Sequence, residues 1–142
     1  MGSRAVAVLV SILALSGTLT AGSERVAKAE QEPGYDPATT INVMATVMDV
    51  REAPRTGPLS GLHLLVRTET ETLEVYLAPD EFLKEFEMTF GKGDRLQIAG
   101  SKVKFGGGYI VLAREVRKSE STLYFRDRKG KPNWKVSEKP TT

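Results

Sequence analysis

The sequence predicts a small all-β domain with one short helix, built as a five-stranded barrel. Five short segments, residues 40–50, 62–68, 72–78, 95–101 and 109–117, alternate apolar and polar side chains with the period of a β-strand. Between the third and the fourth segment, residues 80–90 carry phenylalanine and leucine at helical spacing. Glycine and proline separate the segments. Strands, one helix and further strands in this order are typical of a small barrel, and such barrels mostly bind other molecules.

The first three strands are the expected start of the barrel. Residues 40–50 are followed by a loop at residues 53–61, which contains two prolines and two glycines. Residues 62–68 and 72–78 lie close enough in sequence for a hairpin with its turn at residues 68–71. In that hairpin the alternation places Leu64 and Val75 inside the barrel, and it places His63, Arg67 and Tyr76 outside.

A helix is expected at residues 80–90. Pro79 ends the preceding strand because proline lacks the N–H group that a sheet requires. Asp80 is the expected N-cap, since its side-chain oxygen can accept a hydrogen bond from a free backbone N–H group of the first turn. The apolar stripe that would close one end of the barrel consists of Phe82, Leu83, Phe86 and Phe90.

The last two strands are expected at residues 95–101, with Val103 and Phe105 as an extension, and at residues 109–117. Three consecutive glycines at residues 106–108 permit a tight turn between these strands. Residues 122–126 are a further strand candidate, and residues 127–130 carry a turn signal. Trp134 is expected to pack back onto the barrel and to seal an open edge, with stacking on a ligand as the alternative.

The N-terminus predicts export of the chain. A single positive charge at Arg4, an apolar run at residues 5–15 and small residues up to Gly22 are the three parts of a signal peptide, expected at residues 1–22. The apolar run is short for a bilayer-spanning helix, although an uncleaved anchor remains the alternative. Residues 23–38 are expected to be a flexible linker, residues 39–126 the barrel domain and residues 127–142 a C-terminal tail. The expected compartment is the periplasm or the cell exterior of a bacterium.

The order of these elements resembles the OB-fold. The resemblance covers residues 39–118 and rests on the first strand, the hairpin at residues 62–78, the helix, Gly93 and Asp94 before the fourth strand, and the last hairpin with its glycine turn. Residues 122–134 resemble the tails of small exported bacterial proteins of that fold, whose function is mostly unassigned. The resemblance implies a five-stranded Greek-key barrel with an extra C-terminal strand or tail. It implies no particular activity, because this fold serves many unrelated functions.

Composition excludes several kinds of site. The chain has no cysteine, which excludes disulfides, thiolate metal sites and covalently attached haem. Its formal net charge is only +2, but the charge is unevenly distributed. Residues 101–142 carry 11 basic and 4 acidic side chains, whereas residues 23–100 carry 8 basic and 14 acidic ones. Either the basic third attracts an anionic partner, or the two parts pair within the fold.

No pattern in the sequence predicts catalysis, a metal or a cofactor. His63 is the only histidine, and Glu74 across the hairpin would be its sole partner, whereas a metal centre normally needs several ligands. No serine lies in a nucleophile elbow beside an evident base. The acidic residues between Asp80 and Glu87 are expected on the solvated face of the helix. The sequence therefore predicts a binding module and not an enzyme.

Binding is expected on the outward face of residues 62–78 and on the loops at residues 53–61 and 104–109. The residues predicted to contact a ligand are His63, Arg67, Tyr76, Lys102, Phe105 and Tyr109. A protein partner in the cell envelope is the first interpretation, because edge strands of a small barrel can pair with an added strand. The alternative is a polyanion, namely single-stranded nucleic acid, an anionic saccharide or a lipid head group, bound by the basic C-terminal third. Nucleic acid is disfavoured by export and by Glu69, Glu71 and Glu74 on the same hairpin.

Overall fold

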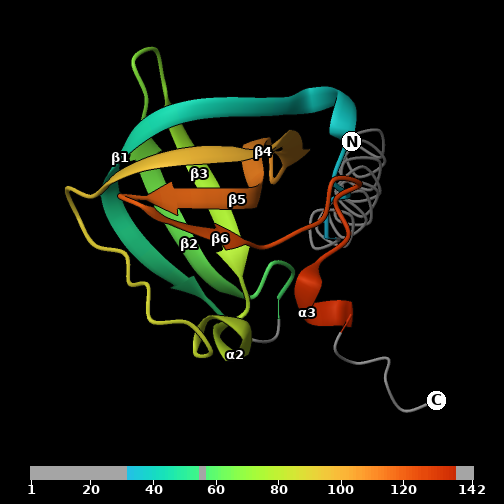
Figure 1. The fold of residues 1–142 in the computed structure, drawn as a ribbon. Helices are drawn as coiled ribbons and strands as arrows, with labels where there is room; N and C mark the ends of the chain where they lie inside the picture. Colours follow the sequence, from blue (N-terminus) through green and yellow to red (C-terminus); the bar gives the residue numbers. More distant parts are fainter. Residues whose placement is uncertain (1–31, 55–56, 137–142) are drawn as a thin grey trace, which may run out of the picture. The chain divides into compact units, whose positions relative to one another are not determined.

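Six strands make up most of the part of the chain that the computed structural model describes, residues 32–54 and 57–136 (Figure 1). The strands are β1 (Thr40–Ala53), β2 (Gly61–Arg67), β3 (Thr72–Ala78), β4 (Arg95–Phe105), β5 (Gly108–Lys118) and β6 (Ser121–Tyr124). Three short helical segments accompany them, η1 (Pro37–Thr39), α2 (Asp80–Leu83) and α3 (Asn133–Val136). The expected signal peptide, most of the expected linker and residues 137–142 of the tail lie outside the described residues.

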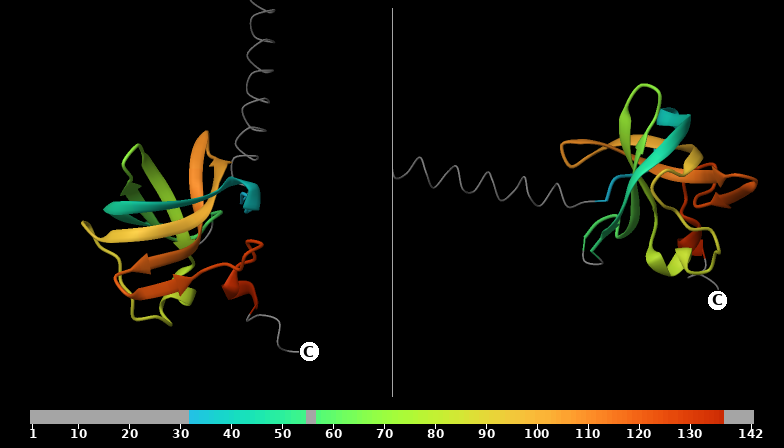
Figure 2. Two further views of the ribbon diagram at one scale, coloured as in Figure 1. Left: turned by 45° about the horizontal axis from the view of Figure 1, so that its top comes forward. Right: turned by 90° about the vertical axis from the view of Figure 1, so that its left-hand side faces the viewer.

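The first five strands close into a mixed barrel, and β6 lies outside it. β1 is antiparallel to β2 and to β4, β2 pairs with β3, and β4 pairs with β5. A short parallel pairing of β3 with β5, Val75 opposite Val111 and Tyr76 opposite Leu112, closes the barrel (Figure 2). This connectivity is that of the OB-fold, so the predicted fold class is confirmed. β6 then adds antiparallel to β5.

A bulge in β1 allows one strand to serve both halves of the barrel. Thr40–Thr46 pair with β4, and Thr46–Ala53 pair with β2. The register shifts between Val47 and Asp49, so that Met48 is the extra residue. An extra residue bends the strand and changes which side chains face inward. Val47 accordingly points into the core before the bulge, and Val50 packs against the core after it.

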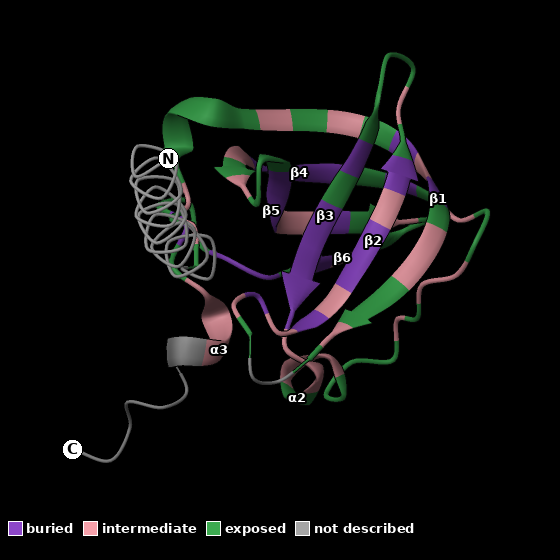
Figure 3. Ribbon diagram, turned by 180° about the vertical axis from the view of Figure 1, so that it is seen from behind, coloured by how far each residue is buried: buried purple, intermediate pink, exposed green. Residues whose placement is uncertain are grey.

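The core consists of the inward side chains of all five barrel strands. Leu64, Val75, Ile98 and Val111 are completely buried, as the expected alternation requires. Figure 3 shows buried residues along β2 and β3, whereas β1 begins with five residues, 40–44, that alternate between exposed and intermediate. A second buried cluster, formed by Leu59, Tyr76, Ile110 and Leu112, lies beside the main core.

The helix prediction was wrong in its length and in its cap. α2 ends at Leu83, and the N-cap is Pro79, without a side-chain hydrogen bond. Acidic side chains at Glu85 and Glu87 oppose the negative end of a helix dipole, which disfavours a longer helix. The apolar residues still reach the barrel, because Phe82, Leu83 and Phe90 pack against the core, whereas Phe86 remains 37% exposed.

The C-terminal elements follow the expectation, except that β6 ends at Tyr124, so that Phe125 and Arg126 of the predicted strand lie outside it. β4 continues to Phe105, and Gly106 and Gly107 both have positive φ angles (57° and 82°), as a two-residue hairpin turn requires. Beyond β6, the N–H of Gly130 donates to the carbonyl oxygen of Asp127 over 3.0 Å and forms the expected turn. Trp134 packs back onto both buried clusters. Within the described residues, none of the helices has the length and apolar character needed to cross a membrane.

Candidate functional site

The structure does not bring the six predicted ligand-binding residues into one site. His63 and Tyr76 lie at the end of the β2–β3 hairpin near the β1–β2 loop, and Arg67 lies beside the turn at its other end. Lys102 and Tyr109 form a separate exposed contact on β4 and β5. Phe105 is half-buried against the second core cluster.

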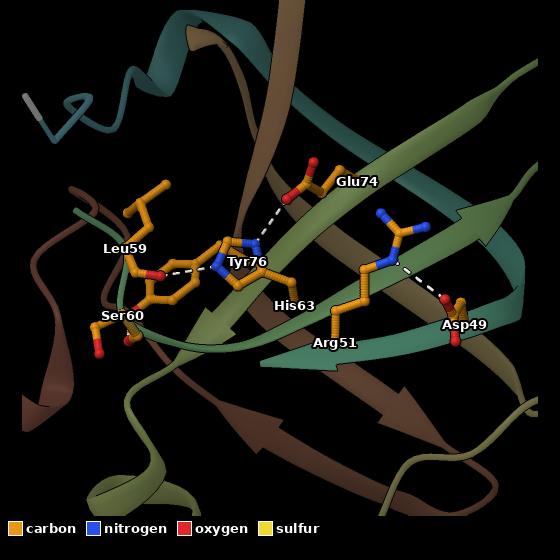
Figure 4. A network of polar contacts seen from close by, with 7 residues as sticks. All are labelled: Asp49, Arg51, Leu59, Ser60, His63, Glu74 and Tyr76. Atoms are coloured by element: carbon orange, nitrogen blue, oxygen red, sulfur yellow. Dashed lines mark hydrogen bonds and ion pairs between the residues drawn. The ribbon is translucent and has the colours of Figure 1, made fainter. Parts of the chain in front are cut away.

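His63 was predicted to lie exposed on the outward face of the hairpin, and the exposure was wrong. The residue is only 6% exposed, and each ring nitrogen has an oxygen partner (Figure 4). Nδ1 lies 2.8 Å from Oε2 of Glu74, and Nε2 lies 2.7 Å from the carbonyl oxygen of Leu59. The β1–β2 loop folds over the hairpin and buries the ring, which strand alternation alone cannot reveal.

Tyr76, also predicted to point outward, is buried as well. Its hydroxyl group donates to the carbonyl oxygen of Ser60 over 2.9 Å, and burial raises its pKa above the usual value. The ring centroid lies 5.1 Å from that of His63. His63 and Tyr76 thus hold two consecutive carbonyl groups of the β1–β2 loop, including that of Leu59, whose φ of 54° is unusual for a non-glycine residue. The geometry supports a structural role for both side chains.

Lys102 and Tyr109 are joined to the β2–β3 turn by charge. Nζ of Lys102 lies 2.9 Å from Oε1 of Glu71 and 5.4 Å from the centre of the Tyr109 ring. A second ion pair, between Lys118 and Asp94, also links the basic third of the chain to the acidic part. The Lys118 ammonium group and the N–H of Gly91 together lower the pKa of Asp94. Pairing within the fold therefore offsets part of the uneven charge.

A groove of about 610 Å³ lies between the first half of β1 and the β2–β3 turn. Of the predicted residues, only Arg67 lines it. The other contributors were missed: Asn42, Met44, Thr46, Met48, Thr68, Thr70 and Arg95 among them. Met44 and Met48 are 51% and 49% exposed. Large apolar residues at outward positions of the first strand were the available sequence signal for this groove.

The groove borders an open strand edge. Between Thr40 and Ala45, β1 pairs with β4 on one side, and no strand of the described residues pairs with it on the other. Val47 directs its backbone N–H and C=O groups to Asp94 and Gly93, on the side of β4. Since successive residues of a strand direct these groups to opposite edges, the backbone groups of Asn42 and Met44 face the open edge.

No cluster of three or more histidine or acidic residues suited to a metal ion occurs within residues 32–54 and 57–136. The groove instead combines two thioether side chains, two exposed guanidinium groups, the exposed carboxylate of Glu69 and unpaired strand backbone. Arg67 makes a long contact of 3.4 Å with Thr72, and Arg95 is exposed. Such a surface can bind an extended polypeptide that offers apolar and acidic side chains.

Comparison with known proteins places the chain in a family. None of the curated proteins matches the chain. Residues 39–123, which run from the start of β1 into β6 and make up more than half of the chain, match the sequence model of a family of magnetosome proteins. The chain therefore belongs to the MamS/MamX magnetosome protein family.

Proposed function

We propose that this protein is an exported, non-enzymatic binding module of the bacterial cell envelope that serves the magnetosome by holding a protein partner. Membership of a magnetosome protein family supports the cellular context. The open edge of β1 beside the groove is the single observation that carries the binding mode.

The proposed partner offers an extended segment that pairs with β1. The backbone groups of Asn42 and Met44 supply the main-chain hydrogen bonds of such an added strand. The exposed thioethers of Met44 and Met48 suit an apolar side chain, since methionine adapts to irregular surfaces. Two guanidinium groups, Arg67 and Arg95, line the groove against one carboxylate, Glu69. This balance favours an acidic residue in the same segment, because guanidinium groups bind carboxylates well.

Proline substitution at the open edge tests the backbone contribution. Met44→Pro removes an N–H group that β4 does not use, and proline is tolerated at the solvent side of an edge strand. Met44→Ala, the matched control, shortens the side chain but keeps the N–H group. Capture of the partner by the immobilised full chain from an envelope extract should fall about tenfold for Met44→Pro, as expected for one lost hydrogen bond. Equal capture by both variants, with unchanged thermal unfolding, would refute pairing at this edge.

A photocrosslinker and charge reversal test the location and the chemistry. A crosslinking residue at position 42 should form an adduct with the captured protein, and one at the exposed Lys104 should not. Arg67→Glu should reduce capture, and Lys104→Glu should not. Retention of the wild-type chain on heparin that disappears steeply with salt, together with no adduct at position 42, would favour the polyanion alternative instead.

A further inference from the structure

Arg126 is a buried cation with an incomplete set of hydrogen bonds. The residue directly follows the buried Phe125 and is only 5% exposed. Its Nη1 donates to the carbonyl oxygen of Gly130 over 2.9 Å. Nε and Nη2 are buried and have no hydrogen-bond partner among the described residues. A buried charge is costly unless it is paired, so these two N–H groups require an acceptor.

The surroundings of Arg126 hold the guanidinium group in place. Its carbon atom lies 5.4 Å from the centre of the Trp134 ring and 5.8 Å from that of Tyr35. The backbone of Arg126 donates to the carbonyl oxygen of Arg114, the bulged residue of β5, and pairs with Pro132. Burial lowers the pKa of Arg126, which is the electrostatic sign of a cation without sufficient compensation.

A second buried polar atom in this cluster also lacks a partner within the described part of the chain. It is the hydroxyl oxygen of Tyr35, whose ring also packs against Gly130. Gly130 has a φ of 95°, and a Cβ atom there would clash with the Tyr35 ring, so only glycine fits. Tyr35 is held at this position by the next residue, because the N–H of Asp36 donates to Oγ of the buried Ser101 over 3.0 Å.

We propose that the Nε–Nη2 edge of Arg126 and the hydroxyl group of Tyr35 form a binding site for one carboxylate group. The Nε–Nη2 edge presents two parallel N–H groups, and a carboxylate accepts both at once. The Tyr35 hydroxyl, carried by a ring whose centre lies 5.8 Å from the guanidinium carbon, is the third donor without a partner in the described part of the chain. Entry requires that neighbouring side chains move, since all three donor atoms are inaccessible to solvent. The site is separate from the β1 groove and independent of the proposed function.

The carboxylate has two possible sources, a free carboxylic acid or Glu32 of the chain itself. The negative charge of Glu32 acts on Arg126, although no ion pair joins the two side chains in the described residues. Both sources share the same chemistry, so the site is best probed with the smallest carboxylate, formate.

Nuclear magnetic resonance of the arginine side chains tests this site directly. The full chain, labelled with ¹⁵N-arginine, is titrated with sodium formate at constant ionic strength against sodium chloride. The Arg126 Nε–H signal, assigned by its loss in Arg126→Lys, should shift downfield and saturate with formate but not with chloride. Tyr35→Phe keeps the ring and should weaken binding about three- to tenfold, as expected for one lost hydrogen bond. Arg128→Lys, in the same turn but exposed, should leave the titration unchanged.

The variant Glu32→Gln separates the two sources. A wild-type chain that responds to formate identifies a site open to a free carboxylate. If formate leaves the Arg126 Nε–H signal of the wild type unchanged but shifts that of Glu32→Gln in a saturable way, Glu32 is the carboxylate that already occupies the site. This outcome also supports the site. If formate shifts the Arg126 Nε–H signal in neither the wild type nor Glu32→Gln, and both spectra are those of a folded protein, the proposal is overturned. Water would then be the acceptor of these N–H groups.

Discussion

His63 and Arg126 are basic side chains that are almost equally buried, but their hydrogen bonding differs completely. Both ring nitrogens of His63 have oxygen partners, Glu74 and the Leu59 carbonyl group. Arg126 satisfies Nη1 alone and leaves Nε and Nη2 without partners in the described residues. The contrast shows that burial does not by itself indicate a functional polar residue. A buried group with every partner supplied by the fold stabilises that fold, whereas one with an unmet donor requires an acceptor from outside the fold, either a ligand or water.

The largest expected loss of stability is for substitution of Trp134, which contacts both the region around His63 and Tyr76 and the region around Arg126. Its ring lies 6.3 Å from that of Tyr76, edge to face, and 5.4 Å from the Arg126 guanidinium carbon. Trp134→Ala should lower the free energy of unfolding in urea by about 3 kcal/mol, because a large aromatic group leaves a cavity. Tyr124→Ala, an exposed aromatic residue on β6, should change it by less than about 0.5 kcal/mol. Similar losses in the two variants would mean that Trp134 does not connect the regions.

His63→Leu tests the region around His63, where every polar atom of the buried ring has a hydrogen-bond partner. The substitution leaves the Leu59 carbonyl group without its donor, so the free energy of unfolding should fall by about 2 kcal/mol. Amide hydrogen exchange should speed up in the β1–β2 loop more than in β4. Arg67→Leu on the same strand, where the side chain is exposed, should have little effect on either measurement. A loss as small as that of Arg67→Leu would show that the loop is held without His63.

Arg126→Met tests the region around Arg126, where two buried N–H groups have no partner among the described residues. Its expected effect on the free energy of unfolding is smaller. Methionine removes one hydrogen bond and the contacts of the charge with two rings, but it also removes a buried charge with two unmet donors. These terms oppose each other, so the free energy of unfolding should change by less than about 1 kcal/mol. Urea unfolding of Arg126→Met and His63→Leu in the same buffer measures the difference. If Arg126→Met lowered the free energy of unfolding as much as His63→Leu does, the difference in hydrogen bonding between the two residues would be contradicted. Such a loss would mean that Arg126 is fully paired in solution.

Acid should loosen the Arg126 region through Asp127. Hydrogen bonds from the backbone N–H groups of the turn, chiefly that of Lys131, lower the pKa of Asp127 from its ordinary value of 3.8. The ionised carboxylate therefore contributes stability that is complete above pH 3.8 and is lost as the pH falls through the lower value of the folded state. Fluorescence of Trp134, the single tryptophan, should report this change below pH 3.8. In Asp127→Ala this part of the change should be absent; an identical acid titration would exclude Asp127 as its cause.

Strand positions were predictable because they depend on local pattern. The residues 72–78 were predicted without error, and the glycine turn and the extension of β4 to Phe105 also followed from the sequence. The helix was predicted too long because apolar spacing at Phe82, Phe86 and Phe90 imitates a helical stripe. In the structure two of the three reach the core from a short helix and an irregular segment.

The candidate sites were much less predictable than the strands. His63 and Tyr76 were placed outside because alternation describes one sheet face and ignores a loop that covers it. Arg126 was treated as an ordinary strand residue, since nothing in its local sequence signals that Tyr35, distant in the chain, lies over it. Met44 and Met48 were not predicted as site residues, because they become the wall of a groove only with the β2–β3 turn beside them.

The amino-acid sequence by itself determined the barrel, because apolar alternation and glycine turns act over a few residues and specify each strand and its inward face. Only the tertiary structure decided which polar groups are saturated and which remain available. That outcome depends on contacts between distant segments: the β1–β2 loop on His63, the N-terminal segment on Arg126 and the β2–β3 turn along the open edge of β1. The spacing of residue types along a short stretch of sequence does not reveal hydrogen-bond partners from distant segments. The sites can therefore be recognised only in the folded chain.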